Sequence, residues 1–186
     1  MDDEQRECVE AALLSSRRLT SLLSDILDIS AVESGKLALF IRQFEPKELV
    51  VSVENLFAHL ALEKGLSLQF SISPELPAVL VGDDQRLRQI LFNLVGNAIK
   101  CTLSGGVTVE VYPLVSRHYD HSRTMFVVSD SGVGIPDDKI GDLFEPFVQG
   151  SVGYSREHQG AGLGLSICKR LTLLMGGNMC VTSEVN

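Results

Sequence analysis

Residues 159–170 read QGAGLGLSICKR, in which three glycines lead directly into an apolar helical pattern. Gly160, Gly162 and Gly164 occupy every second position of the first half. Small residues let backbone N–H groups close on an anion at the positive end of a helix, so this stretch suggests a phosphate site. A dinucleotide-binding turn, a nucleoside-triphosphate loop and a plain helix start all fit these twelve residues.

The residues around this stretch exclude two of the phosphate-binding motifs. A Rossmann fingerprint needs a strand directly before its glycines and an acid about 20 positions later. The preceding residues are polar and contain glycine, as a loop does, and the acid that follows, Glu184, lies late in the final segment. The sequence GxxxxGK[ST] is absent from the chain, which excludes a Walker loop. A glycine-rich start that merely packs the helix closely remains an alternative.

A second glycine cluster follows an apolar run at residues 129–136, SDSGVGIP. Asp130 comes directly after this expected strand and is followed by Gly132 and Gly134. A carboxylate in an enclosed position needs hydrogen-bond donors, and the exocyclic amine of adenine supplies one while Val133 and Ile135 cover the base. An Asp turn closed by its own backbone is the alternative interpretation.

The third feature is an expected helix at residues 84–102. Arg86, Gln89, Asn93, Asn97 and Lys100 share an arc of about 80° opposite the apolar face. A polar stripe is usually a solvated face, but asparagine is a mediocre helix former, so two on one stripe indicate a further role. An amide oxygen suits Mg²⁺, which keeps few protein ligands, and a lysine adds a point charge for phosphates.

Four segments in this order resemble the N, G1, F and G2 boxes of sensor histidine kinases, a branch of the Bergerat-fold ATPases: NLVGNAIK (93–100), DSGVGIP (130–136), DLFEPFVQ (142–149) and GAGLGLSI (160–167). The resemblance covers about residues 8–184. Residues 22–37, LLSDILDISAVESGKL, also resemble the second helix of the kinase dimerisation domain and its exit into the catalytic domain.

The resemblance implies roles for individual residues. Asp130 would hold the adenine amino group, Asn97 would ligate Mg²⁺, and Asn93 and Lys100 would line the phosphate side as catalytic residues. Phe144 and Phe147 would anchor an ATP lid over about residues 149–160, although they also fit as core aromatics. The other implied nucleotide-binding residues are Gly132, Gly134, Ile135, Arg156, Gly160, Gly162, Leu163, Gly164 and Leu165.

One position separates branches of this superfamily. Its hydrolytic members carry a glutamate four residues before the metal-binding asparagine, where this chain has Asn93. An asparagine side chain is no general base at neutral pH, so we expect slow hydrolysis and ATP positioned for an acceptor. The acceptor in the family is a histidine followed by an acid on the first dimerisation helix. None of the histidines, His59, His118, His121 and His158, has that setting.

Composition and pattern complete the expected organisation. The chain has 186 residues and a formal net charge of −8, which disfavours a nucleic-acid binder. It shows no membrane-length apolar run, and its four cysteines lie far apart, as in a reducing compartment.

Hydrophobic periodicity predicts helices at 4–33, 46–63, 84–102 and 162–175 and strands at 36–44, 66–72, 106–112, 124–130 and 178–184.

We therefore predict an α+β two-layer sandwich of the Bergerat type, a mixed sheet with helices on one face, after one long helix. Residues 1–34 would be the second dimerisation helix and residues 35–186 the ATP-binding domain, with the last strand missing. The expected partners are ATP with Mg²⁺, an acceptor histidine outside the chain and a response-regulator receiver domain. A second copy of the chain is expected to pair through the N-terminal helix predicted at 4–33. We expect no self-phosphorylation and a cytoplasmic location, which also fits the cytoplasmic end of a membrane-anchored sensor. The alternative is a non-catalytic module of this fold that nucleotide switches between partner-binding states.

Overall fold

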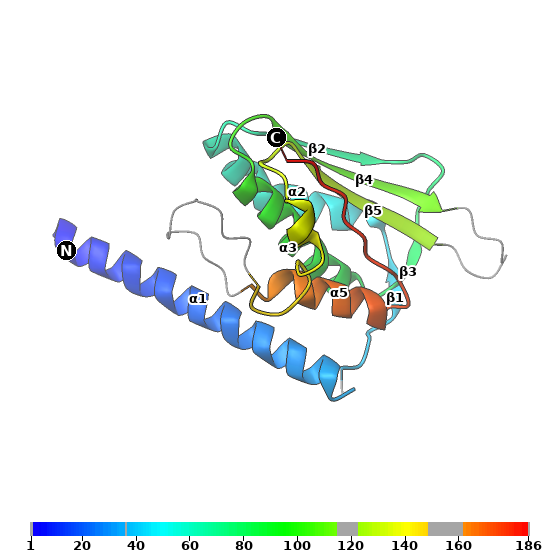
Figure 1. Ribbon diagram of the computed structural model, residues 1–186, viewed down its shortest axis with the longest axis horizontal. Coiled ribbons are helices and arrows are strands. Elements are labelled where there is room, and N and C mark those ends of the chain that lie inside the picture. Colours follow the sequence, from blue (N-terminus) through cyan, green and yellow to red (C-terminus); the bar gives the residue numbers. More distant parts are fainter. Residues whose placement is uncertain (1, 36, 115–122, 149–161, 186) are drawn as a thin grey trace.

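The computed structural model describes residues 2–35, 37–114, 123–148 and 162–185 (Figure 1). Predicted residues that fall in the other segments, among them Arg156, Gly160 and three of the histidines, lie outside the described residues. In chain order the elements are α1 (Asp3–Glu33), β1 (Arg42–Phe44), α2 (Pro46–Glu63), β2 (Ser67–Ile72), β3 (Leu80–Gly82), α3 (Asp84–Cys101), β4 (Gly106–Leu114), β5 (Arg123–Asp130), α4 (Asp137–Ile140) and α5 (Gly164–Leu174).

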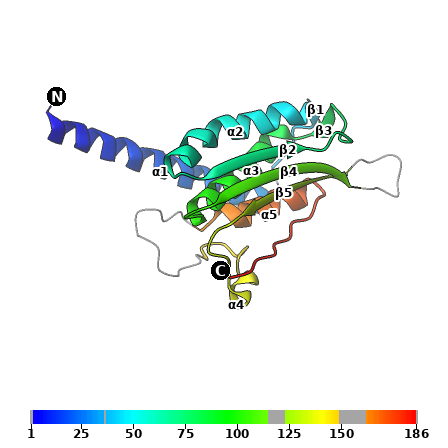
Figure 2. The ribbon, with the colours of Figure 1, turned by 90° about the horizontal axis from the view of Figure 1, so that it is seen from above.

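The main sheet has the order β2-β4-β5 and mixes both pairing directions. Strand β2 runs parallel to β4, with Ser67 opposite Gly106, and β4 runs antiparallel to β5, with Val107 opposite Asp130. Helices α2, α3 and α5 lie together on one side of this sheet, and α1 projects away from them (Figure 2). The prediction of a mixed sheet covered by helices on one face is therefore confirmed.

The core lies between the sheet and helices α2 and α3. Valines of β4 point inward at alternate positions, as expected of a strand with one buried face. They meet apolar side chains of both helices in one cluster, and α5 packs on the other side of α3 through a second cluster around Leu163, Ile167 and Leu171. The buried members of the first cluster are Leu49, Val53, Ala61, Leu66, Leu91, Val95, Ala98, Ile99, Val107 and Val109.

Local sequence signals explain where the helices begin. Pro46 occupies the first turn of α2, where its missing N–H and fixed φ cost nothing. Asp83 caps α3, since its Oδ1 accepts a hydrogen bond from the backbone N–H of Arg86 at 3.0 Å. Both helices match the predicted ranges to within a residue. The helix predicted at 162–175 forms over 164–174.

Two predicted strands differ from the structure, because one is shorter than expected and the other does not form. The expected strand at 36–44 shortens to β1, which pairs with β3 in a separate two-stranded sheet. Residues 178–184 form no strand. Instead, the Oγ of Ser183 accepts a hydrogen bond from the N–H of Ile135 at 2.8 Å, so a side chain takes a backbone donor that a ladder would have used. The short helix α4 lies between the predicted strand at 124–130 and the predicted helix at 162–175, where no helix was predicted.

Candidate nucleotide site

The G1 segment passes directly beneath the last turn of α3. A Cβ on Gly132 would lie 2.7 Å from the carbonyl oxygen of Cys101 and 2.6 Å from the Oδ1 of Asp130, both too close for any side chain. Gly132 is therefore required by a close approach of two backbone segments. The contact brings the end of β5 against the end of α3.

Asp130 makes the turn that we considered as its alternative role. Its Oδ1 accepts a hydrogen bond from the N–H of Gly132 at 2.9 Å. The carboxylate is exposed, and within the described part of the chain no group donates a hydrogen bond to its Oδ2. The turn and a ligand role are compatible, because a carboxylate has two oxygens and about four acceptor sites.

The rest of the G1 segment is shaped by the C-terminal residues. Gly134 has φ +73°, in the left-handed region, and a Cβ there would lie 1.9 Å from the carbonyl oxygen of Glu184. Ile135 is half-buried and held by Ser183. Glycine is needed at position 134 for both its conformation and its space.

The polar stripe of α3 divides into two parts. Asn93 and Asn97 are half-buried and Lys100 is exposed. A Cβ on Gly164 would lie 3.1 Å from the Oδ1 of Asn93, which places the first turn of α5 against this stripe. Arg86, at the other end of the stripe, is instead bound to α1. Sequence reasoning had not foreseen that contact.

Helix α5 presents an uncapped N-terminus there. Its N-cap residue Leu163 makes no side-chain capping hydrogen bond, and the side chain of Leu163 is buried in the core, so Leu163 can offer a ligand only its backbone. Leu165 is half-buried in the first turn. The first N–H groups of a helix lack intrahelical partners and carry partial positive charge, so they favour an anion.

The F segment meets the residues before α5. The N–H of Phe147 donates to the carbonyl oxygen of Gly162 at 3.1 Å. Phe144 lies under the ammonium group of Lys169, 5.0 Å from the ring centroid, which fixes it to α5. The Phe147 side chain is 71% exposed, so Phe147 is not a core aromatic.

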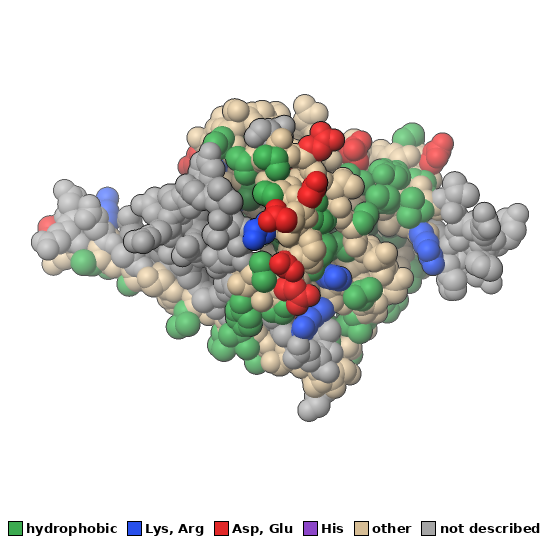
Figure 3. Space-filling view, viewed as in Figure 1, with side chains coloured by type: hydrophobic (Ala, Val, Ile, Leu, Met, Phe, Trp, Pro, Cys, Tyr) green, Lys and Arg blue, Asp and Glu red, His purple; other side chains and the backbone are tan. Residues whose placement is uncertain are grey.

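Charge around the site is unevenly distributed. In Figure 3 carboxylates gather over the middle of the face, with Lys or Arg side chains beside them. Asp137 and Asp138 of α4 are exposed. Like charges repel a triphosphate, which leaves Lys100 and the start of α5 as the favourable side. Burial and then the nearby Asp130 carboxylate raise the pKa of the Cys101 thiol, so this cysteine stays protonated at neutral pH.

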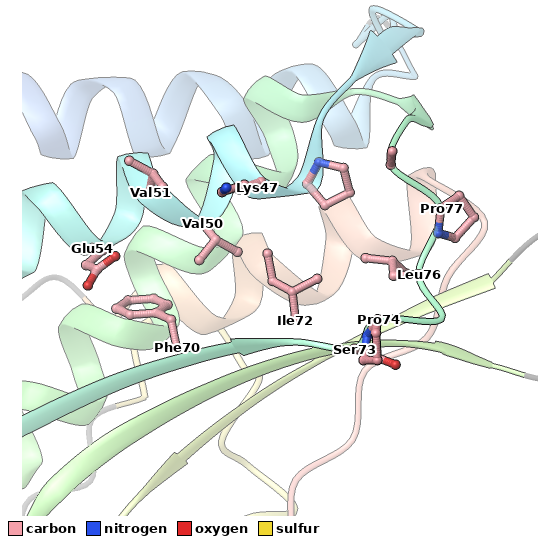
Figure 4. Close-up of a pocket in the computed structure, with 12 residues that line it drawn as sticks. Lys47, Val50, Val51, Glu54, Phe70, Ile72, Ser73, Pro74, Leu76 and Pro77 are labelled. Carbon is pink, nitrogen blue, oxygen red and sulfur yellow. The ribbon is translucent and has the colours of Figure 1, made fainter.

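A cavity of about 470 Å³ lies elsewhere, between α2, β2 and the residues that follow β2 (Figure 4). Its walls are largely apolar, and none of the predicted site residues belongs to them. It is therefore a gap at the edge of the core, lined by Pro46, Lys47, Val50, Val51, Glu54, Phe70, Ile72, Ser73, Pro74, Leu76, Pro77 and Ala78.

Among the described residues no three His, Cys, Asp or Glu side chains cluster as a metal site. Within these ranges, too, we find no helix with the length and apolar character that crossing a membrane requires.

Comparisons with known proteins show the family to which the chain belongs. Residues 82–186 match the family of histidine kinase-, DNA gyrase B-, and HSP90-like ATPases. The chain is 40% identical over 179 residues to the sensory/regulatory protein RpfC of Xanthomonas campestris, and this match covers 96% of the chain and 25% of RpfC. It is 39% identical over 184 residues to the hybrid signal transduction histidine kinase B of Dictyostelium discoideum, covering 99% of the chain and 9% of that protein.

A solved structure gives the same result. Full-length ShkA in complex with AMPPNP superposes with a TM-score of 0.78 at 35% identity, covering 95% of the chain and 35% of ShkA. The chain therefore belongs to the histidine kinase-, DNA gyrase B-, and HSP90-like ATPase family, with the ATP-binding catalytic domains of sensor histidine kinases as its relatives. It spans a quarter or less of the length of these two curated relatives.

Proposed function

We propose that this chain is the ATP-binding catalytic part of a sensor histidine kinase, which positions Mg-ATP for phosphoryl transfer to a histidine outside these 186 residues. The observation that carries the proposal is that both glycine clusters pack against the same helix, α3. Gly132 packs on Cys101 and Gly164 packs on Asn93. These positions are eight residues apart, or roughly 12 Å along the helix axis, the scale that separates the base of a nucleotide from its triphosphate.

The base would bind at the Cys101 end. Oδ2 of Asp130 is available to accept the adenine amino group while Oδ1 keeps the turn with Gly132. Gly134 and Ile135 would form the apolar floor beneath the ring. A carboxylate acceptor beside apolar residues favours a purine that carries an exocyclic amine.

The triphosphate would bind at the Asn93 end. Asn97 offers an amide oxygen, a ligand type that Mg²⁺ accepts, and Mg²⁺ keeps few protein ligands and takes the rest from water and phosphates. When bound, Mg²⁺ would neutralise phosphate charge. Asn93 and Lys100 would contact the phosphates directly, together with the backbone around Gly162, Leu163, Gly164 and Leu165 and, from outside the described residues, Arg156 and Gly160.

Phosphoryl transfer in such a site is mainly positioning and charge stabilisation. Asn93 orients a phosphate oxygen but takes no proton from water, so we expect hydrolysis to be slow. The acceptor imidazole brings its own lone pair. His59 is an exposed partner of Glu63 on α2, 3.2 Å away, and nothing directs it to the site.

The remaining features of the proposal concern the whole protein. Residues 1–34 would be the second helix of the dimerisation domain and residues 35–186 the catalytic domain. Leu19, Leu23 and Ile26 leave an exposed apolar stripe on α1, which suits a partner helix from a second copy. We propose a response-regulator receiver domain as the next phosphoryl acceptor and a cytoplasmic location for the catalytic part.

Two measurements test the proposal. Calorimetric titration of the chain with ATP, with and without Mg²⁺, should show binding, and Asp130→Asn, which can keep the turn, should weaken it about tenfold or more. Mixing the chain with Mg-ATP and a separate helix pair that carries the acceptor histidine should then produce acid-labile phosphate on that histidine. Nucleotide binding without phosphohistidine would favour the nucleotide-switched module, and unchanged affinity of Asp130→Asn would refute the role of Asp130.

A further inference from the structure

A polar cluster joins α1 to the first turns of α3. The Oδ1 of Asp28 accepts a hydrogen bond from the Nη1 of Arg86 at 3.0 Å, and its Oδ2 accepts one from the Nε2 of Gln89 at 2.7 Å. The same Nη1 also donates to the Oε1 of Gln89 at 2.7 Å. Both carboxylate oxygens of Asp28 are used, and the side chain is only 14% exposed.

The segment after α1 adds apolar and backbone contacts to the same two helices. The N–H of Leu37 donates to the carbonyl oxygen of Ala31, and its side chain packs into the cluster between α3 and α5. The N–H of Phe40 donates to the Oδ2 of Asp83 at 2.8 Å, at the start of α3. The end of α1 is therefore fixed to α3 and α5, the helices on which the proposed phosphate site is built.

The position of this cluster connects it to that site. Gln89, Asn93 and Asn97 follow one another at four-residue spacing, so they lie along one face of α3. Asp28 is hydrogen-bonded to Gln89 at one end of this face, and the proposed phosphate and metal residues Asn93 and Asn97 lie toward the other end. A shift of α1 relative to α3 would thus change the direction from which an acceptor attached to α1 meets the phosphates.

We propose that Asp28, Arg86 and Gln89 are positioning residues, which set the orientation of the ATP-binding domain relative to α1 and so align the phosphoryl donor with the acceptor histidine. This inference rests on the proposed kinase function. Transfer needs the reacting atoms about 3–3.5 Å apart and in line, so a small rotation at the cluster is costly for the reaction. Nucleotide binding needs no such alignment.

The first test uses this chain alone and requires no kinase activity. Hydrogen exchange is compared among the wild type, Gln89→Ala, Asp28→Asn and the control Gln85→Ala, an exposed glutamine one turn earlier on α3. In Gln89→Ala and Asp28→Asn we expect faster hydrogen exchange over residues 26–37 and unchanged exchange in β4. The ATP affinities of both variants should stay within about twofold of the wild type. Unchanged exchange over residues 26–37 in both variants would overturn the proposed contact, whether or not the chain proves to be a kinase.

The second test measures transfer in the full-length kinase. Asp28→Arg should lower kcat for histidine phosphorylation about tenfold or more without changing KM for ATP. The exchanged pair Asp28→Arg with Arg86→Asp should recover most of the rate, since Gln89 can hydrogen-bond either polarity. Wild-type kcat in Asp28→Arg, a raised KM for ATP, or no recovery in the pair would each contradict the positioning role. Absence of transfer in the wild type would contradict the proposed function instead.

Discussion

The backbone N–H of Phe147 donates to the carbonyl oxygen of Gly162 at 3.1 Å, which joins the end of the F segment to the residue two positions before α5. Both residues have left-handed backbones, with φ +65° for Phe147 and +70° for Gly162. A left-handed φ is strained for phenylalanine and comfortable for glycine. The hydrogen bond thus holds two segments in a specific geometry at the proposed phosphate side.

Replacing Gly162 should disrupt this junction. A Cβ there would lie 2.9 Å from the carbonyl oxygen of Val148, in addition to the unfavourable φ, so Gly162→Ala should lower the free energy of unfolding by about 1–3 kcal/mol. It should also weaken ATP binding, measured by titration. Gly141→Ala is the matched control, since Gly141 has φ −58° and open space around its missing Cβ. Equal losses of stability and of ATP affinity in Gly162→Ala and Gly141→Ala would contradict the proposed importance of this junction.

The approach of Gly132 to α3 gives a second prediction. Gly132→Ala must separate β5 from Cys101, because the new Cβ would lie 2.7 Å from a backbone oxygen. We expect a loss of about 1–3 kcal/mol in chemical denaturation and a loss of ATP affinity. Gly96→Ala on α3 should instead gain about 0.5–1 kcal/mol, because its Cβ would make ordinary contact with Phe57 at 3.5 Å. Gly132→Ala with wild-type stability and affinity would show that this approach is unimportant.

The sequence alone predicted the parts of the fold with strong periodicity and local signals. The apolar face of α3, its Asp83 cap and the proline at the start of α2 act over a few residues, so their ranges could be read directly. The order of the four boxes predicted that Asp130 and Asn93 belong to one site. The structure packs the segment of Asp130, at Gly132, against the end of α3, the helix that carries Asn93.

The failures have a common physical cause, which is long-range contact. Residues 178–184 alternate like a strand, but a strand needs a ladder, and Ser183 bonds Ile135 through its side chain. The sequence pattern predicts Arg86 and Gln89 on the polar stripe of α3 and indicates no role for them, whereas both bind Asp28, about 60 residues away in sequence. An acid on an amphipathic helix carries no local signal that names its partner, so this cluster could not be foreseen.

The metal role of Asn97 leads to a third prediction. Asn97→Ala removes an amide oxygen without adding charge, so it should weaken ATP binding about tenfold in the presence of Mg²⁺ and by less than about twofold in its absence. Isothermal titration with and without Mg²⁺ measures both affinities. Asn55→Ala, an exposed asparagine on α2, controls for general effects of the substitution. Equal weakening under both conditions would remove Asn97 from the proposed metal site.

The ion pair between Arg42 of β1 and Asp84 at the start of α3 predicts that the stability of the fold falls in acid. Arg42 binds both carboxylate oxygens of the buried Asp84, with its Nη2 2.7 Å from Oδ2, and Arg88 approaches Oδ2 at 3.5 Å. The hydrogen bond from Arg42 is the main cause that holds the pKa of Asp84 below its usual 3.8, against the opposing effect of burial.

A depressed pKa in the folded state fixes the sign of this dependence. The unfolded chain binds the proton more tightly, so the charged carboxylate stabilises the fold above about pH 4, and this contribution falls as the pH drops through the folded pKa. Denaturation of the wild type and Asp84→Asn between pH 7 and pH 2 should therefore show curves that are far apart at neutral pH and converge in acid. Arg42→Ala should reduce the gap and Gln43→Ala, its exposed neighbour on β1, should not. A gap that stays constant down to pH 2 would mean that the charge of Asp84 contributes nothing to the stability of the fold.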